Sequence, residues 1–292
     1  MQITLDLLNE YRACSAGKEW FAVVFPNGGE YQAVLDAACE DNQPVWAEWL
    51  LNKAGPAKTV FKAKILTNKK HFVFAGSIRI SENIYISGKL ISGSGIQAGH
   101  GIQAGHGILA GEGIQAGHGI LAGHGIQAGH GILAGWGIEA GNKIKAGLGI
   151  LAGDGILASN GIQAGWGIEA GEGIKASRGI KAGSGVHAGW GIEAGDEIEA
   201  SRGIKAGWGI KAGDGIKAGE GIKAGDGIQA GLGIEAGDEI EAGLGMGIFA
   251  GLYIRVSNWT VKAKVLAKTK PENLISGYWA GEENKKAEPC EP

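Results

Sequence analysis

The sequence predicts a mainly β fold, a single-stranded triangular β-solenoid that follows a small α-helical module. Three observations support this prediction. From Ile96 to Ile240 an isoleucine or valine occupies every sixth position, and an alanine follows each of them two residues later. Glycine accounts for 56 of the 292 residues and flanks these triplets. Residues 1–56, in contrast, are poor in glycine and space their apolar residues as helices do.

The repeat unit Gly-Ile-x-Ala-Gly-x predicts a regular β-solenoid over residues 95–247. Its six-residue period differs from the period of about 3.6 residues in a helix and about 7 in a coiled coil. The Ile-x-Ala triplet predicts a short strand with two inward side chains and one outward side chain. The flanking glycines predict corners, because they reach backbone angles that other residues adopt at a cost. Collagen is excluded, because the chain lacks a three-residue glycine period and has only 6 prolines.

One coil is expected to contain three repeat units, or about 18 residues. Ser159 and Ser177 replace the same glycine three units apart, and Lys143 and Glu197 break the consensus nine units apart. A series of histidines spaced by two units favours a flattened, two-sided coil instead. Three isoleucines and three alanines fill a narrow triangular interior well, which favours three units in a coil. The handedness of the coil stays open.

Both ends of the array deviate from the consensus, because the open sheet edge at a solenoid end must be blocked. Residues 57–94 are predicted to form capping strands and the first coils, and residues 248–281 a C-terminal coil and cap. The register slips by two at residues 245–247 and resumes with Ile248 and Ile254.

Two similar lysine-rich segments bracket the array, residues 60–66 and 260–266. Both are predicted to be strands, and lysine at a sheet edge discourages end-to-end pairing. Capping is the preferred interpretation of these segments, and partner binding is the alternative. Residues 282–292 are predicted to be a disordered tail.

The helical module, residues 1–56, is predicted to contain four helices. They span residues 4–11, 18–24, 31–39 and 42–52, with Thr4 as the first N-cap. Acidic residues outnumber basic ones in this module. So small a unit cannot easily bury three tryptophans, so these are candidate partner-binding residues: Trp20, Trp46 and Trp49.

The repeat resembles two families of triangular solenoid. An aliphatic residue at every sixth position is similar to the hexapeptide-repeat left-handed β-helix, although that family prefers a small residue where this chain has His100, Glu112 or Trp136. The alternation of glycine and aliphatic residues is similar to bactofilin-like polymer-forming proteins. Residues 13–21 and 45–50 look similar to a helical module of phage and prophage proteins. This last resemblance implies a phage-encoded protein that engages a host factor.

Composition narrows the expected partners and compartment. The formal net charge of −3 gives no overall attraction to nucleic acid or acidic membranes, so neither is an expected partner. The three cysteines, Cys14, Cys39 and Cys290, are too few for a disulfide framework and fit a reducing compartment. The first residues lack the pattern of a signal peptide, and no long apolar run is present. A cytoplasmic protein is therefore expected.

Histidines at one corner position are the candidate metal ligands. Pairs of them three repeat units apart could share a metal, but no cysteine or carboxylate completes a tetrahedral set, so we expect a solvated row and no metal or cofactor. The histidines are His100, His106, His118, His124 and His130.

Other functions are weighed against the uniformity of the repeat. Acyl transfer, which left-handed hexapeptide proteins perform, needs protruding loops, and none is inserted from Ile96 to Ile240. Ice binding usually uses threonine ladders, and residues 95–247 contain no threonine. A nucleic-acid mimic would need more negative charge than 16 acidic against 10 basic residues in that segment. We therefore expect a non-enzymatic protein without catalytic residues, and these roles remain the alternatives.

The expected function is structural presentation or protein–protein interaction, with a rigid solenoid that carries the helical module. Exposed tryptophan is enriched in binding hot spots. Four corner tryptophans are therefore further candidate partner-binding residues: Trp136, Trp166, Trp190 and Trp208. If a coil has three repeat units, Trp136, Trp190 and Trp208 share one edge. Packing of these rings against neighbouring glycines is the alternative. A protein partner is expected, and homo-oligomerisation stays open.

Overall fold

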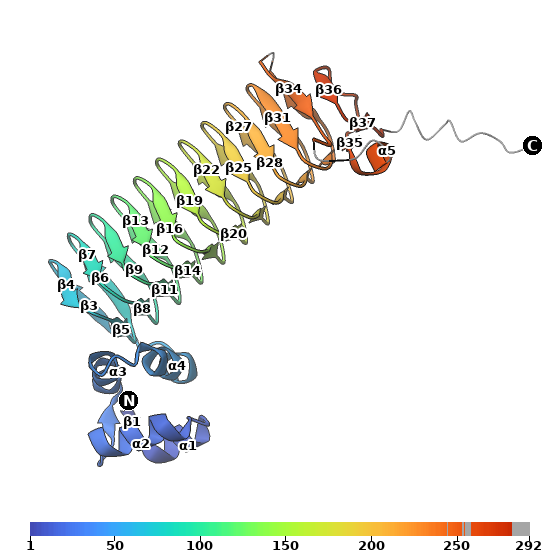
Figure 1. Ribbon diagram of the computed structural model, residues 1–292. Helices are drawn as coiled ribbons and strands as arrows, with labels where there is room; N and C mark the ends of the chain where they lie inside the picture. Colours follow the sequence, from blue (N-terminus) through green and yellow to red (C-terminus); the bar gives the residue numbers. More distant parts are fainter. Residues whose placement is uncertain (244, 253, 255–257, 282–292) are drawn as a thin grey trace, which may run out of the picture. The chain divides into compact units, whose positions relative to one another are not determined.

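The computed structural model describes residues 1–243, 245–252, 254 and 258–281. The chain divides into two compact units, Met1–His130 and Gly131–Pro292. Its fold is a mainly β solenoid of parallel sheets, with about 18 residues in each turn and a small N-terminal helical segment (Figure 1). The predicted fold class and coil length are therefore confirmed, and the two-sided coil is wrong.

The first unit begins with the four predicted helices. Thr4 caps α1, because its side-chain oxygen accepts a hydrogen bond from Leu7 N at 3.2 Å. Helix α2 starts three residues before its predicted start, and Cys14 Sγ accepts a hydrogen bond from Gly17 N there. The elements are β1 Gln2–Ile3, α1 Leu5–Glu10, α2 Ser15–Val24, β2 Gly29–Glu30, α3 Tyr31–Glu40 and α4 Pro44–Ala54, and β1 and β2 pair antiparallel.

Parallel coils form the rest of the first unit. Each strand pairs with the strand three places later in the chain, so Ile102 lies between Ile84 and Ile120. Segment 60–66 is not the single strand predicted, because Lys64 and Ile65 lie in a corner between two sides of a coil. The strands are β3 Val60–Ala63, β4 Leu66–Lys69, β5 Phe72–Phe74, β6 Ser77–Ile80, β7 Ile84–Ile86, β8 Leu90–Ser92 and the Ile-x-Ala strands from β9 Ile96–Ala98 to β14 Ile126–Ala128. Within this unit the register shifts where β4 pairs with β7.

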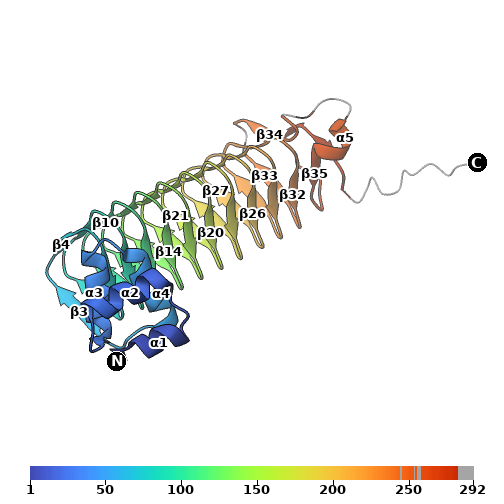
Figure 2. The ribbon, with the colours of Figure 1, turned by 60° about the horizontal axis from the view of Figure 1, so that its bottom comes forward.

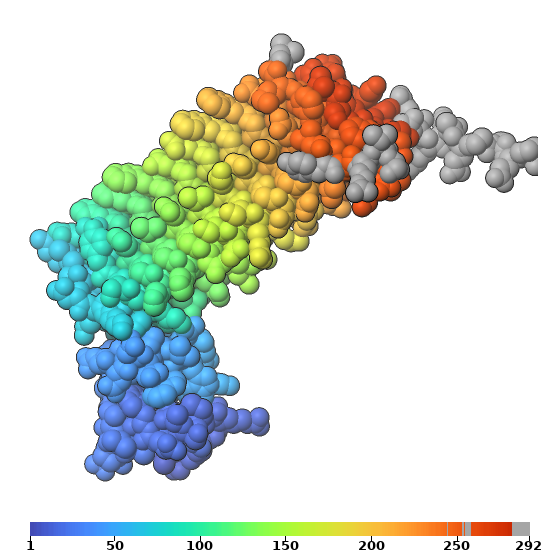
Figure 3. All heavy atoms as spheres, in the orientation of Figure 1, coloured from blue at the N-terminus to red at the C-terminus, as the bar shows by residue number. Residues whose placement is uncertain are grey.

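The second unit repeats this arrangement with few departures. Its strands begin at six-residue intervals from β15, Ile132–Ala134, to β33, Ile240–Ala242, except that β31, Gly227–Ala230, starts one residue early. Parallel pairing again joins equivalent residues of successive coils, as between Ile150 and Ile168. On the face seen in Figure 3 these coils appear as successive bands in sequence order.

The C-terminal end of the second unit departs from the prediction. The two-residue slip is confirmed, because Ile248 pairs with Ile228. Ile254, however, lies outside any strand. Segment 260–266 is not a single strand. Its first residues belong to helix α5, and the strand that pairs with the strand of Ile234 begins only at Lys264. The elements are β34 Gly247–Phe249, α5 Trp259–Lys262, β35 Lys264–Leu266, β36 Leu274–Ser276 and β37 Tyr278–Trp279; the predicted disordered tail, 282–292, lies outside the described residues.

The two glycines of each corner do different work. A Cβ atom on the glycine after alanine would lie about 2 Å from a carbonyl oxygen of the preceding coil, as for Gly171 against Gly153 O. A Cβ atom on the glycine before isoleucine would lie farther from the nearest carbonyl oxygen, at 3.4 Å for Gly173 against Gly191 O and at 3.1 Å for Gly161 against Gly179 O. The first glycine therefore permits close stacking of coils. The second tolerates side chains, which explains why Lys143 can stand in that position.

The helices close the first coil of the first unit (Figure 2). One hydrophobic cluster joins Leu35 and Leu51 of the helices to Val73 and Ile91 of the coils. Gln32 completes the junction, because its side-chain amide donates to Val73 O at 2.8 Å and accepts from Ala75 N at 2.9 Å. The helical segment thus covers the coil end that would otherwise expose apolar side chains.

A buried histidine also links these parts of the first unit. His71 Nδ1 accepts a hydrogen bond from Lys89 N at 3.0 Å, and its Nε2 lies 3.0 Å from Asn42 Oδ1. Since Nδ1 accepts, the ring proton resides on Nε2 and is donated to Asn42. Nearby, Lys89 forms an ion pair with Glu48 of α4 at 2.6 Å.

Candidate binding pocket in the helical segment

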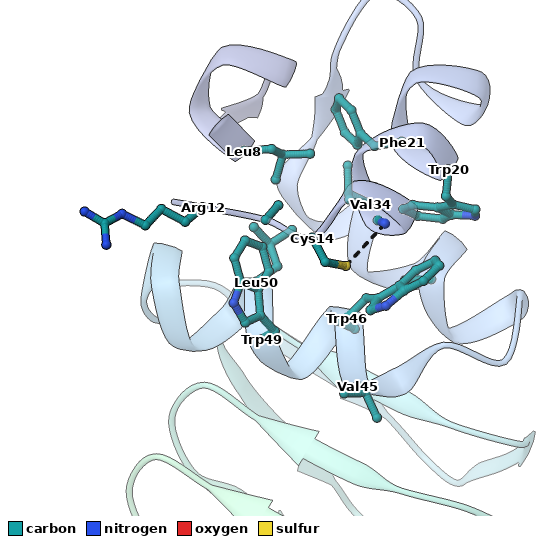
Figure 4. Close-up of a pocket in the computed structure, with 14 residues that line it drawn as sticks. Leu8, Arg12, Cys14, Trp20, Phe21, Val34, Val45, Trp46, Trp49 and Leu50 are labelled. Atoms are coloured by element: carbon teal, nitrogen blue, oxygen red, sulfur yellow. Dashed lines mark hydrogen bonds between the residues drawn. The ribbon is translucent and has the colours of Figure 1, made fainter. Parts of the chain in front are cut away.

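The three tryptophans of the helical segment line one apolar pocket (Figure 4). Trp20 comes from α2, whereas Trp46 and Trp49 come from α4. Residues three and four positions apart share one face of a helix, so Gly17, Trp20 and Phe21 of α2 all face the pocket. The pocket has a volume of about 350 Å³. The structure therefore brings together the tryptophans that the sequence left without a place in the core.

Ring contacts and one hydrogen bond hold the tryptophan wall in place. The ring centroids of Trp20 and Trp46 lie 5.7 Å apart, and Phe25 meets Trp20 edge-on at 6.1 Å. Trp20 Nε1 donates to Asp41 Oδ2 at 2.6 Å, which ties α2 to the residue after α3. The polar edge of Trp20 is thereby satisfied, while the tryptophan rings stay only half-buried.

The remaining lining is almost entirely apolar. Buried side chains from all four helices form its floor: Leu8, Phe21, Val34, Ala38, Ala47 and Leu50. Val45 is 61% exposed and stands at the mouth. A pocket of this kind binds through burial of apolar surface, which contributes about 25 cal/mol per Å² removed from water.

Arg12 and Cys14 supply the polar groups of the pocket lining. Of the described residues that line it, Arg12 alone carries a charge. Arg12 is exposed and has a left-handed backbone with φ 60. Cys14 is exposed, whereas Cys39 is buried away from the pocket, and burial raises the pKa of the Cys39 thiol to about 11. The sequence had not singled out Arg12, because nothing in its neighbours marks a left-handed residue.

The corner tryptophans of the second unit form one stacked pair. Trp190 and Trp208 lie on consecutive coils with ring centroids 5.9 Å apart, and they are 53% and 62% exposed. Trp136 occupies the same edge three coils earlier, and Asp154 and Glu172 occupy the coils between.

Trp166 lies on a different edge and is also exposed. The four rings therefore do not make one continuous stripe, and the pocket of the first unit gathers its tryptophans more closely.

Histidines of the first unit stack in pairs from coil to coil. The rings of His100 and His118 are 5.0 Å apart and nearly parallel, and those of His106 and His124 are 5.1 Å apart. Parallel rings direct their nitrogen lone pairs side by side, whereas a metal needs lone pairs that converge. Within the described residues, no three His, Cys, Asp or Glu side chains gather as a metal-binding group.

Charged side chains in the second unit pair along the sheets. Lysine and glutamate on neighbouring coils form exposed ion pairs, for example Lys175 with Glu193 at 2.9 Å and Lys181 with Glu199 at 2.6 Å. Glu199 raises the pKa of Lys181 by hydrogen bonding and by its charge, and Glu197 adds to the effect. These faces therefore present alternating charges.

The fold and the pocket define a parallel β-solenoid protein with an N-terminal helical domain that carries an apolar cavity. Residues 1–55 match the family described as YdhT N-terminal domain. This match covers the four helices and the pocket, and none of the coils. Comparison with curated proteins and with solved structures gives no match. Among the described residues, none of the helices combines the length and apolar character needed to cross a membrane.

Proposed function

We propose that this chain is a non-enzymatic protein-interaction protein. Its helical segment binds an apolar segment of a protein partner in the three-tryptophan pocket, and the solenoid coils support that segment. The observation that carries the proposal is the convergence of Trp20, Trp46 and Trp49 on a cavity of about 350 Å³. Tryptophan dominates binding hot spots, and the cavity volume lies in the range of ligand pockets.

The nature of the pocket supports an apolar protein segment as its occupant. Ring faces and aliphatic side chains make up nearly all of the lining, so a bound apolar side chain loses its contact with water without leaving polar groups unpaired. A phage-encoded origin, a host factor as the partner and the bacterial cytoplasm as the location complete the proposal. The phage origin and the host factor rest on the sequence resemblance to phage and prophage proteins alone, whereas the cytoplasm rests also on the small number of cysteines.

Substitution of one exposed residue tests the proposal. Val45→Glu places a charge at the pocket mouth, at a side chain that is 61% exposed, so folding should be unaffected. Val23→Glu is the matched control, because Val23 is 81% exposed on α2 and does not line the pocket. The full wild-type chain first captures partner proteins, which are then identified. A peptide that contains the apolar segment of each partner is titrated against the wild type, Val45→Glu and Val23→Glu.

We expect Val45→Glu to weaken binding of that segment at least about tenfold, because a buried charge is costly, and Val23→Glu to leave it unchanged. Equal affinity of the wild type and Val45→Glu would show that recognition lies elsewhere. Thermal melting of both variants verifies that the helices remain folded.

A further inference from the structure

Arg12 occupies a backbone position that ordinarily belongs to glycine. It follows α1 with φ 60, and the helix end is closed by hydrogen bonds from Arg12 N to Asn9 O at 3.0 Å and from Ala13 N to Leu8 O at 2.9 Å. This left-handed end of a helix is usually glycine and sometimes asparagine, because a Cβ atom strains the left-handed backbone. An arginine here therefore costs stability.

Other left-handed positions in the described part of the chain use the residues that tolerate them. The two further non-glycine examples are both asparagine, Asn42 and Asn68, each with φ 61. Gly55, which ends α4, and Gly28, which precedes β2, both have φ 80. Arg12 is thus the exception, and a residue held in a strained backbone position is a candidate for a functional role.

Arg12 belongs to the lining of the three-tryptophan pocket, and its side chain extends outward from there, with the guanidinium group directed away from the labelled tryptophans (Figure 4). The guanidinium group is exposed, and none of the ion pairs among the described residues includes it. A guanidinium group binds carboxylates through two parallel hydrogen bonds.

We infer that the pocket recognises an apolar side chain of the partner together with a carboxylate beside it, and that Arg12 binds this carboxylate. The occupant is a protein segment in which bulky apolar residues adjoin an aspartate or glutamate. This inference rests on the proposed function and specifies its partner. It explains both the single charge in the lining and the use of arginine at a left-handed position.

A random peptide library displayed against the immobilised full chain tests this inference. The wild type should select peptides with bulky apolar residues next to Asp or Glu. Arg12→Gly should keep the apolar selection and lose the acidic one. Its melting temperature should equal or exceed that of the wild type, because glycine relieves the backbone strain. Lys18→Gln is the control for lost charge, because Lys18 does not line the pocket and bonds to Asn9 instead.

The best selected peptide and its Asp→Asn or Glu→Gln counterpart are then titrated. The acidic form should bind the wild type and Lys18→Gln about fivefold more tightly than the neutral form, and Arg12→Gly equally. An unchanged ratio in Arg12→Gly, or a lower melting temperature of that variant, overturns the inference.

The remaining outcomes separate this inference from the proposed function. Apolar selection without acidic residues overturns only the role of Arg12. If Val45→Glu weakens the binding of none of the selected peptides, the proposed function is overturned as well. Decanoate that binds the pocket more tightly than the best peptide would assign the site to a fatty acid instead.

Discussion

The two glycines of one corner allow the stacking of coils to be tested by a matched pair of substitutions. Gly171→Ala would bring a Cβ atom to 2.0 Å from Gly153 O, so the backbone must shift. Gly173→Ala, two residues away, would make an ordinary contact of 3.4 Å with Gly191 O. Both substitutions add one methyl group to the same corner, so they differ only in what that group meets.

The serines that replace the first glycine show how far the backbone can shift. Ser177 N donates to Ala158 O at 3.3 Å and Ser201 N to Ala182 O at 3.3 Å, whereas Gly171 N donates to Ala152 O at 3.2 Å. A small side chain is therefore accommodated there without loss of the hydrogen bond between coils. We expect Gly171→Ala to lower the free energy of unfolding by about 1–2 kcal/mol. Gly173→Ala should change it by less, or raise it by about 0.4–1 kcal/mol, because alanine loses less backbone entropy.

Urea unfolding followed by circular dichroism measures both variants against the wild type. A difference of at least about 1 kcal/mol between them, with Gly171→Ala less stable, is the expected result. Equal stabilities, or a larger loss for Gly173→Ala, would refute the assignment of close stacking to the first glycine.

Two further predictions concern the coil interior and the junction of the first unit. Ile168→Asp should lower the free energy of unfolding in urea by about 4 kcal/mol or more, because Ile168 is only 1% exposed. Glu169→Lys, at the neighbouring outward residue, should lower it by less than about 0.5 kcal/mol. Similar losses would refute the inward and outward assignment. Burial, and then Lys70, His106 and Lys89, lower the pKa of His71 from 6.5, so its neutral form stabilises the fold above pH 6.5 and this contribution is lost as the pH falls further. The unfolding free energy should therefore fall below pH 6.5, and His71→Gln should weaken this dependence; an identical pH profile for the variant would contradict the role of His71.

The coils could be predicted closely because each position of the repeat has one task there. The isoleucine and alanine of each triplet point inward, and the corner glycines recur at the contacts between coils. The sequence pattern alone is therefore enough to predict the coil. Segment 260–266 shows the limit of such reasoning. Its sequence is similar to that of segment 60–66, yet Val60 pairs with Ser77 whereas Trp259–Lys262 is helical. The neighbouring coil, and not the local pattern, decides which conformation such a short segment adopts.

The pocket could be predicted only in part. Surplus tryptophans indicated that the helical segment has an exposed aromatic surface, and all three of them line the pocket. Its shape depends on how all four helices approach one another, which no local pattern encodes. The hydrogen bond from Trp20 to Asp41 joins residues 21 positions apart, and the left-handed backbone of Arg12 appears only when the helix end is closed.

The relation between the repeat and the turn has a consequence at the level of the gene. A repetitive DNA tract gains or loses whole units by slippage, and the unit here encodes six residues, whereas one turn contains about 18. Loss of a single unit would preserve every inward isoleucine yet rotate all later outward residues onto the next face. Only changes by three units would preserve the pairing of lysines such as Lys175 with glutamates and the stacking of Trp208 on Trp190. Selection on such a gene would therefore act on length in steps of a full turn.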